Sequence, residues 1–486
     1  MNYEIKTLGA LKEQGYKSRS IKSELRENLI ENIKKGIPSF TGIHGYEHTV
    51  IPQLERAILS EHNINLLGLR GQAKTRLARL MIQLLDAYIP AIEGSEINDD
   101  PLLPISSFGI SQVAELGDET PIKWIHREDR FYEKLATPDV TISDLIGDID
   151  PIKAAHMKLS YADERVIHFG MIPRANRSIF VINELPDLQS RIQVALFNIL
   201  EEGDIQIRGF QLRLPLDLQF VFTANPEDYT NRGSIVTPLK DRIGSQILTH
   251  YPRSIEVAKT ITTQEAKLQK GRVCEIHIPE LAKDLVEQIG FEARDNEFVD
   301  NKSGISARMS ITAYENLLST AEHRCIGSGS QETSIRFTDI LGMTPSIIGK
   351  VELVYEGEQE GAEFVAERLI GAAAKTLFDQ YFPAIKKLKH ETDKDPYEKV
   401  LLWFFEQTSF ELMDDASEIE YREALNSIKP LDELVGTYMP NIADKDQLFI
   451  KEFILWALVE YKKLNKKRIA KGFEFKDSYG AYLSNL

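Results

Sequence analysis

Cysteine is nearly absent from this chain of 486 residues, in which Cys274 and Cys325 are the only two thiols. Two cysteines are too few for a framework of disulfide bonds or for a zinc site with four thiolate ligands, so we expect a reducing, cytoplasmic environment. The chain also lacks any run of about 18 consecutive apolar residues, and its first segment, MNYEIKTLGALKEQGYKSRS, has no apolar core of a secretion signal. We therefore expect neither a transmembrane helix nor a membrane partner.

Positive charge is also in short supply, since 58 Lys and Arg residues stand against 74 Asp and Glu residues for a net charge of −16. A domain that binds nucleic acid is usually basic, so this balance argues against a general nucleic-acid partner. The hydrophobic content of 42% and the charged content of 27% are typical of a globular protein. The length suits roughly two to four domains.

Short apolar segments alternate with amphipathic patterns in the first half of the chain. INLLGL, RSIFVINE and LQFVFTAN are predicted to be buried strands, and helical patterns follow the first two at about 74–88 and 185–203. Strands that alternate with helices imply a parallel sheet covered by helices, hence an α/β fold. GDIQIRGFQLRLPL alternates with period two around Arg208 and Gly209 and predicts a β-hairpin.

The remaining segments are predicted to be mostly helical, apart from one irregular stretch. Residues 18–35 show a helical pattern, as do 253–325 and the region after 346, which includes EKVLLWFFEQTSFELM and FILWALVEYKKLNKKR. We interpret the basic run KKLNKKR as a solvated helix end, and the alternative is contact with nucleic acid. Residues 93–140 look irregular and polar, which indicates a long insertion.

The segment NINLLGLRGQAKTRLARL, residues 63–80, places a glycine-bearing turn between a strand and a helix. This is the context of a phosphate-binding loop, because the N–H groups of such a turn point at phosphate oxygens. Lys74 would reach the β- and γ-phosphates of ATP, and the Thr75 hydroxyl would bind Mg²⁺. The alternative is a glycine-rich turn with a solvated lysine. The expected ATP-binding residues are Gly68, Gly71, Gln72, Ala73, Lys74 and Thr75.

Ala73 precedes the lysine at a position where many phosphate loops have glycine. If this residue has helical dihedral angles, its methyl group costs nothing and favours the start of the helix. We therefore expect Ala73 to be compatible with a working loop.

SIFVINEL supplies Asn183 and Glu184 where phosphate-loop ATPases need an acidic pair at a strand end. Glu184 would polarise the attacking water, and Asn183 would accept a hydrogen bond from a water on Mg²⁺. Because the amide is uncharged, Mg²⁺ attraction should be weaker, and Asn183→Asp should strengthen Mg²⁺ dependence or raise the rate. The alternative is a polar strand end before a helix.

Two further residues follow in the order that an ATPase requires. Asn225, at the end of LQFVFTAN, would orient the attacking water, and Arg242 in LKDRIG would act as an arginine finger towards a neighbouring subunit. The alternative for Arg242 is a surface ion pair with Asp241 or Glu227. A finger that acts on a neighbour implies an oligomer, for which we expect a homo-hexamer.

With these residues, the chain resembles AAA+ ATPases of the clade that holds MoxR proteins and the I subunit of magnesium chelatase. The loop GxxGxAKT resembles MoxR proteins, whereas TPDVTISDLIGDIDPIKA, FGMIPRANRSIFVINEL and the TANPED–LKDRIG series look more like magnesium chelatase I. The likeness covers roughly residues 38–325. It implies a P-loop AAA+ core with a parallel sheet, a helical lid and ATP with Mg²⁺ as cofactors.

The same resemblance implies roles for other segments. GIHGYEHTVIPQLERAIL would line the adenine pocket with Gly45 and Tyr46, and SGISARMSITAYENL would carry the sensor 2 arginine, Arg308. Residues 145–172 would form the helix-2 insert and 203–215 the hairpin before sensor 1. We expect four parts: an N-terminal helical extension (1–37), the AAA+ α/β domain (38–252), a helical lid (253–345) and a mostly helical C-terminal domain (346–486).

The leading hypothesis is an ATP-driven ring motor that remodels or activates a partner protein. The resemblance implies a partner with a von Willebrand A domain and metal insertion as one output. Asn183 motivates a second hypothesis, a nucleotide-gated scaffold with little hydrolysis. A third hypothesis is a σ54-type transcriptional activator, a class that has the same type of ATPase domain. The chain lacks the GAFTGA loop of that class.

Overall fold

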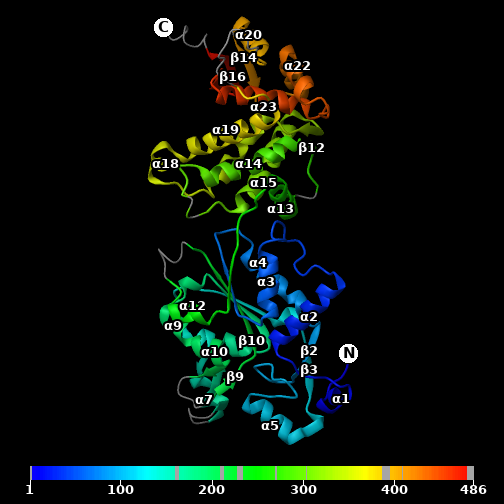
Figure 1. Cartoon of the computed structure of the whole chain (residues 1–486), viewed down its shortest axis with the longest axis vertical. Helices are drawn as coiled ribbons and strands as arrows, with labels where there is room; N and C mark the ends of the chain where they lie inside the picture. The colour runs from blue at the N-terminus through cyan, green and yellow to red at the C-terminus, as the bar shows by residue number, and fades with distance from the viewer. Residues whose placement is uncertain are drawn as a thin grey trace. The chain divides into compact units, whose positions relative to one another are not determined.

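A computed structural model describes residues 3–158, 164–207, 213–226, 234–268, 271–300, 302, 304–385, 395–407 and 409–478. The chain divides into two compact units, residues 1–250 and 251–486, coloured blue to green and green to red in Figure 1. Each unit has its own hydrophobic clusters. The boundary between the units lies close to the predicted start of the lid at 253.

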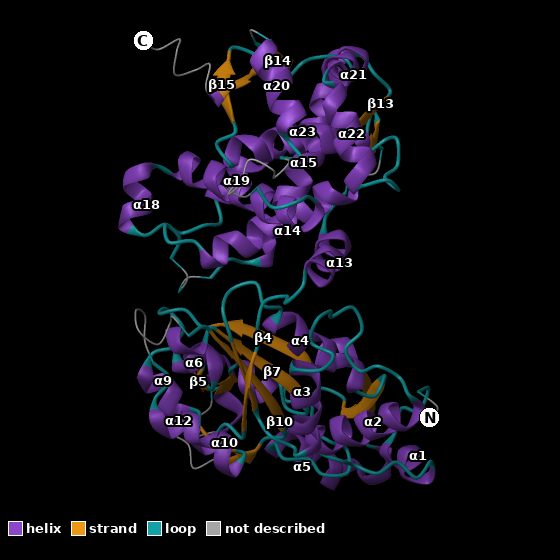
Figure 2. Ribbon diagram, turned by 45° about the horizontal axis from the view of Figure 1, so that its top comes forward, coloured by secondary structure: helices purple, strands orange, loops and turns teal. Residues whose placement is uncertain are grey.

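Five parallel strands form the central sheet of the first unit, in the order β11-β1-β10-β7-β4. Figure 2 labels β10, β7 and β4 of this sheet. Three of the five, β1, β7 and β10, are strands that the sequence predicts. The five are β1 (Ile64–Leu67), β4 (Phe131–Leu135), β7 (Ser178–Asn183), β10 (Leu218–Ala224) and β11 (Ser245–Leu248). The parallel, helix-covered sheet confirms the predicted α/β fold class.

Helices cover both faces of this sheet, because successive side chains of each buried strand point to opposite sides. In β7, Ile179 and Val181 join a cluster with residues of the helices on one face, whereas Phe180 and Ile182 join a cluster on the other. The first cluster takes residues from α2 (Ile21–Lys35), α3 (Val50–Leu59) and α4 (Lys74–Leu80). The second takes residues from α6 (Ile142–Leu145), α8 (Met171–Arg174), α9 (Ser190–Ala195), α10 (Phe197–Glu202) and α12 (Thr237–Arg242).

Two predicted helices have different bounds in the structure. The helix expected at 74–88 is α4 followed by one 3₁₀ turn, Met81–Leu84, before the chain becomes extended at Leu85. The helix expected at 185–203 is divided into α9 and α10 at Leu196. The helix predicted at 18–35 is confirmed as α2, which begins after the capping hydroxyl of Ser20 and ends at Gly36.

The prediction that residues 93–140 are irregular is wrong. This stretch contains α5 (Ser107–Leu116), β3 (Ile122–His126) and β4. Strand β3 pairs with β2 (Tyr88–Ile92), and β4 pairs with β7 at one edge of the central sheet. The sequence FYEKL of β4 gives little sign of a strand, because its edge position leaves most of its side chains only partly buried.

Short antiparallel pairs complete the first unit. Strands β8 (Asp204–Gln206) and β9 (Arg213–Pro215) confirm the predicted hairpin, although Arg208 and Gly209 at its turn lie outside the described residues. Strands β5 (Gly147–Ile149) and β6 (Ile167–Phe169) pair on either side of α7 (Pro151–Met157) in the sequence. Helix α1 (Leu8–Glu13) lies at the N-terminal end of the chain.

The second unit is mainly helical, as predicted. Helices α14 (Glu280–Asp295), α15 (Ala307–Ser328), α19 (Ala362–Tyr381) and α23 (Gln447–Glu460) contribute to one hydrophobic cluster, which takes residues from both sides of position 345. The four-part division of the chain therefore stays a prediction. The other elements are α13 (Ile255–Glu265), β12 (Glu275–His277), β13 (Glu332–Ser334), α16 (Phe337–Ile340), α17 (Thr344–Ile348), α18 (Tyr355–Glu360), α20 (Glu398–Glu406), α21 (Glu418–Ser427) and α22 (Lys429–Tyr438). Within the described ranges, no helix has the length and apolar character needed to cross a membrane.

A three-stranded antiparallel sheet departs from the helical prediction for the C-terminal region. Its order is β14-β16-β15, with bounds Phe410–Met413, Gly472–Asp477 and Leu464–Ile469. The basic run KKLNKKR is therefore not a helix end: α23 stops at Glu460, and Lys462 has a left-handed φ of 57°. Pairing of β15 with β16 outweighs the local helical pattern.

Candidate functional site at the strand ends of the first unit

The loop after β1 is the predicted phosphate loop, and close packing explains its first glycine. The N–H of Gly68 donates to the carbonyl of Ala224 at 3.1 Å. A Cβ atom on Gly68 would lie 2.0 Å from the Thr249 hydroxyl oxygen and 2.2 Å from the Gln72 side-chain oxygen. Any side chain there would break the 2.7 Å hydrogen bond between Thr249 and Gln72. Gly71, with a φ of 74°, takes a left-handed conformation that glycine adopts freely.

Ala73 does not have the helical dihedral angles under which its methyl group would be free of cost. Its φ of 55° and ψ of 18° lie in the left-handed region. This conformation costs an L-residue about 1–2 kcal/mol, because Cβ approaches the following carbonyl oxygen. The loop therefore holds strain at the residue that precedes Lys74.

Lys74 begins α4, and oxygens already surround its ammonium group. Nζ donates to the carbonyl oxygens of Gly68 and Leu69, the latter at 2.9 Å, and to Oδ1 of Asn225 at 2.7 Å. Asn225 is buried and directly follows β10. The predicted phosphate-binding lysine and the predicted water-orienting asparagine are therefore in direct contact.

Thr75 and Asn183 also meet at these strand ends. The Thr75 hydroxyl donates to Asn183 Oδ1 at 3.3 Å, and the Thr223 hydroxyl of β10 donates to the same oxygen at 3.0 Å. Hydroxyl and amide oxygens are hard donors, which suit Mg²⁺. Thr75 and Asn183 thus fit the expected ion, although neither carries a negative charge.

Glu133 of β4 lies against Asn183, a contact that the sequence analysis missed. Asn183 Nδ2 donates to Glu133 Oε1 at 2.6 Å, and Arg79 of α4 donates to Glu133 Oε2 through Nε at 3.0 Å and Nη2 at 2.6 Å. The Glu133 side chain is 24% exposed and that of Arg79 is 61% exposed. The sequence carries no clear signal for this contact, because the pairing that places β4 beside β7, with Leu135 opposite Asn183, is seen only in the structure.

Glu184 follows Asn183 directly and has a strained backbone. Its φ of 57° and ψ of 48° are left-handed, and its N–H donates to the Thr223 hydroxyl at 3.1 Å. Left-handed conformations are uncommon for residues other than glycine, and such strain concentrates at functional sites. The partly buried Glu184 thus follows the strand end where Asn183 meets Thr75.

Tyr46 contacts the backbone of the phosphate loop. Its hydroxyl lies 3.0 Å from the carbonyl oxygen of Gln72 and 2.7 Å from that of His250. Burial raises the pKa of the Tyr46 phenol to about 12, so the group remains a donor at neutral pH. Gly45 precedes it with a φ of 80°. Contact of Gly45 and Tyr46 with an adenine base stays a prediction.

Arg242 forms an ion pair within the chain with Glu201, a partner that the sequence did not suggest. Its Nε and Nη2 each lie 2.7 Å from Glu201 Oε2, and Nη1 donates to the carbonyl of Pro238 at 2.9 Å. Glu227, one of the two partners considered from the sequence, lies outside the described residues. A partly exposed pair of this kind is worth about 0–1 kcal/mol, so little energy holds Arg242 in place. Its action on a neighbouring subunit stays a prediction.

Arg308 belongs to the second unit, where it is the second residue of α15 and is exposed. Its N–H donates to the Ser306 hydroxyl, which caps this helix, at 3.1 Å. Its role as a sensor of nucleotide stays a prediction.

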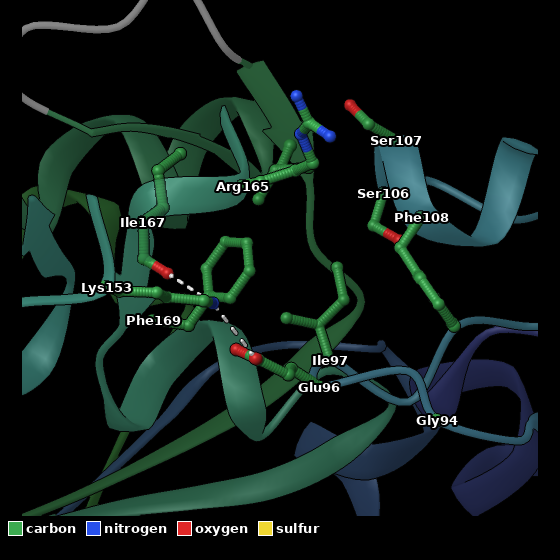
Figure 3. A pocket seen from close by; sticks show the side chains of 11 residues that line it. Gly94, Glu96, Ile97, Ser106, Ser107, Phe108, Lys153, Arg165, Ile167 and Phe169 are labelled. Carbon is green, nitrogen blue, oxygen red and sulfur yellow. Dashed lines mark hydrogen bonds and ion pairs between the residues drawn. The ribbon is translucent and has the colours of Figure 1, made fainter. Parts of the chain in front are cut away.

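A pocket of about 350 Å³ elsewhere in the first unit does not involve the predicted ATP-binding residues (Figure 3). At its wall, Lys153 Nζ lies 3.4 Å from Glu96 Oε1 and 3.5 Å from the carbonyl oxygen of Ile167. Apolar side chains, among them Ile97 and Phe169, line it together with Ser106, Ser107 and Arg165. This pocket is therefore distinct from the strand ends where Lys74 and Thr75 lie.

Comparison with known proteins relates the first unit to AAA domains. Residues 123–243 match the family model described as AAA domain (dynein-related subfamily), a range that contains β4 and Arg242 but begins after the phosphate loop. The magnesium-chelatase 38 kDa subunit of Cereibacter sphaeroides is 24% identical over 205 residues, which cover 40% of this chain and 54% of that protein. The same subunit of Rhodobacter capsulatus is 25% identical over 191 residues, covering 39% and 49%. The chain thus spans about half the length of the curated relatives it matches.

One solved structure with a similar chain is a model of the complex between subunits BchI and BchD of magnesium chelatase. It is 18% identical, covers 66% of this chain and 98% of its own, and has a TM-score of 0.34. A TM-score of this size does not establish a common arrangement of the whole chain.

Proposed function

Because the chain is an AAA+ protein related to the I subunit of magnesium chelatase, we propose that it binds ATP with Mg²⁺ in its first unit and hydrolyses it. One observation carries this proposal: side chains from three distant segments meet at one edge of the sheet. Lys74 contacts Asn225 at 2.7 Å, and Thr75 contacts Asn183 at 3.3 Å. A lysine and a hydroxyl beside two amides at strand ends suit a triphosphate and its cation.

Each of these residues has a distinct task in the proposed reaction. The ammonium group of Lys74 exchanges its contacts with loop carbonyls for contacts with phosphate oxygens. Asn225, which accepts a hydrogen bond from Lys74, orients the attacking water. Glu184 accepts a proton from that water. Bound Mg²⁺ would neutralise phosphate charge, and Thr75 and Asn183 would hold it.

The proposed output is remodelling or activation of a partner protein by a homo-hexameric ring. Arg242 would leave its pair with Glu201 and act on the nucleotide of the next subunit, which the small energy of that pair permits. The family relationship favours a partner protein with a von Willebrand A domain. It also favours metal insertion as the process that the motor serves. Arg242→Ala is expected to reduce turnover while the affinity of the isolated subunit for ATP is kept, and a large loss of that affinity would refute the action in trans.

Asn183 supports one alternative, a nucleotide-gated scaffold with little hydrolysis. An uncharged residue at this position attracts Mg²⁺ less than an aspartate does, which would slow turnover without preventing binding. The two functions differ in steady-state ATPase activity, which only the motor requires.

The decisive experiment compares ATP binding and turnover in the unmodified chain and in Glu184→Gln. We expect Glu184→Gln to bind ATP normally but to lose turnover by about 100-fold or more, since removal of a general base has effects of that size. Tight binding with no turnover in either protein would favour the scaffold. If the unmodified chain does not bind ATP, the proposal fails.

A further inference from the structure

The carboxylate of Glu133 is the charged group in direct contact with Asn183. Strand β4 lies beside β7 in the central sheet (Figure 2), and Asn183 Nδ2 donates to Glu133 Oε1 at 2.6 Å. A charge-assisted hydrogen bond of this kind is short and strong. An aspartate at 183 would supply both a charge and an oxygen from one residue, whereas here two residues on neighbouring strands divide those properties.

This contact also decides which way the Asn183 amide points. If the amide were turned over, its oxygen would face the Glu133 carboxylate, and two acceptors would oppose each other. In the observed orientation the amide oxygen receives the hydroxyls of Thr75 and Thr223 at 3.3 and 3.0 Å. Glu133 therefore directs the Asn183 oxygen towards Thr75, the residue expected to bind the cation.

Arg79 restrains the carboxylate without taking over both of its oxygens. It donates to Oε2 of Glu133, which leaves Oε1 on Asn183. At 61% exposure, the charge of Arg79 is screened by water more than that of Glu133, which is 24% exposed. Negative charge therefore remains beside Asn183.

We infer that Glu133 is a positioning residue for Mg²⁺: it supplies the negative charge that Asn183 lacks and holds the Asn183 oxygen towards the ion. This inference rests on the proposed binding of ATP with Mg²⁺. Residues that orient a metal-binding group typically change metal affinity by about 10- to 100-fold when they are mutated. A simple ion pair that only stabilises the fold would leave the Mg²⁺ affinity unchanged.

The test measures Mg²⁺ affinity rather than hydrolysis. ATP affinity of the full chain is measured in EDTA, and the Mg²⁺ concentration at half-effect is then obtained by titration of Mg²⁺ into the ATP complex. For Glu133→Gln we expect this midpoint to rise about 10-fold or more, with affinity in EDTA within about two-fold. Glu115→Gln, the same change at an exposed position of α5, should leave the midpoint unaltered.

A second test moves the negative charge from position 133 to position 183. Asn183→Asp alone, which the sequence led us to expect would strengthen Mg²⁺ dependence, would place a second carboxylate against that of Glu133. In the double variant Glu133→Gln/Asn183→Asp, donor and acceptor are exchanged and one charge remains. Its midpoint should return to within about three-fold of the unmodified chain. No recovery would overturn the inference.

Arg79→Met separates charge supply from a structural ion pair, and it keeps the test decisive if Glu133→Gln alone fails to fold. It breaks the same pair but leaves Glu133 on Asn183, so the midpoint should be unchanged or lower. An equal rise in Arg79→Met and Glu133→Gln, or no rise in Glu133→Gln, would overturn the inference while ATP binding stands. If the unmodified chain binds no ATP either in EDTA or with Mg²⁺, the proposed function fails too.

Discussion

The two units each contain a network of charged side chains, and the networks are completed in different ways. In the first unit, Lys74 relies on two carbonyls of its own loop and on Asn225, and the adjacent Arg79–Glu133 pair is partly exposed. In the second unit, Arg324 donates to both oxygens of Asp339 at 3.1 and 2.7 Å, and both side chains are buried. The Arg79–Glu133 pair is more exposed to solvent than the Arg324–Asp339 pair, although Arg324 and Asp339 also line a pocket of about 670 Å³.

Glu452 has several hydrogen-bond partners in the second network. This buried carboxylate accepts the N–H groups of Phe337 and Thr338 at 2.8 and 3.1 Å and the hydroxyl of Tyr421 at 2.6 Å. The guanidinium of Arg336 lies 4.1 Å from the Tyr421 ring centroid. These contacts connect α16, α21 and α23, so the network serves to hold the unit together.

The exposure and hydrogen-bond partners of the charged groups, more than their number, distinguish a ligand site from a structural network. Ala73 and Glu184 are both left-handed and lie at the strand ends of the first unit, but Asn98, Arg177 and Lys462 are left-handed elsewhere, so backbone strain alone does not mark the site. The first network should therefore control ligand affinity, and the second should control stability.

The largest expected effect is on stability, from Arg324→Met. The change leaves the buried Asp339 without its partner, which typically costs about 3–5 kcal/mol. Urea denaturation should show this loss in the second unit, and the ATP affinity of the surviving folded protein should stay within about two-fold. A loss of ATP affinity without a loss of stability would contradict the assignment of the second network to stability.

Glu452→Gln should next reveal a dependence of stability on pH. Burial raises the pKa of the Glu452 carboxyl to about 7, so the folded chain keeps this proton at pH values where the unfolded chain has released it. Stability from this group is present below about pH 4.5 and is lost as the pH rises to about 7, on the order of 3 kcal/mol. The free energy of unfolding of Glu452→Gln, minus that of the parent, should therefore increase over this interval. A constant difference would contradict the assignment.

Lys74→Met should have the opposite effect to Arg324→Met: a large loss of ATP affinity and a small change in the free energy of unfolding. Loss of a charged donor to phosphate should weaken ATP binding by about 2–3 kcal/mol, or roughly 100-fold. Stability should change less than ATP affinity does, by about 1 kcal/mol, because only one of the three hydrogen bonds lost is to a buried side chain, that of Asn225. Calorimetric titration and urea denaturation of the same preparation measure both quantities. Equal losses in both would remove the distinction between the networks.

The smallest effect is expected from Ala73→Gly. Relief of the left-handed strain should raise the free energy of unfolding by about 0.5–1 kcal/mol, after allowance for the greater freedom of glycine in the unfolded chain. Ala78→Gly, inside α4, should instead lower it by about 1 kcal/mol or more. Urea denaturation of both variants checks the sign, and destabilisation by Ala73→Gly would show that the loop is not strained there.

The predicted part of the site depended on local sequence. A glycine turn between β1 and α4 and polar residues at the ends of β7 and β10 are readable because parallel buried strands are continuous apolar runs. Their order along the chain was enough to expect Lys74, Thr75, Asn183 and Asn225 at one edge of the sheet. In the structure these four side chains form two contacting pairs, and their roles stay a prediction.

The missed parts depended on pairing with distant segments. Strand β4 is short and mostly only partly buried, and its pairing with β7 defines it as a strand, so Glu133 was not visible as a neighbour of Asn183. The basic strand β15 is likewise defined by its pairing with β16. Dihedral angles such as those of Ala73 also depend on the surrounding loop and are not specified by residue type alone.

The separation of Asn183 and Glu133 onto adjacent strands affects how related chains are recognised. A pattern search that demands aspartate immediately before Glu184 rejects this sequence, although a carboxylate lies 2.6 Å from the asparagine amide. Chains set aside as inactive because one motif residue has changed should therefore be searched again on the neighbouring strand, including positions two residues from the register partner of the changed residue, as Glu133 is from Leu135.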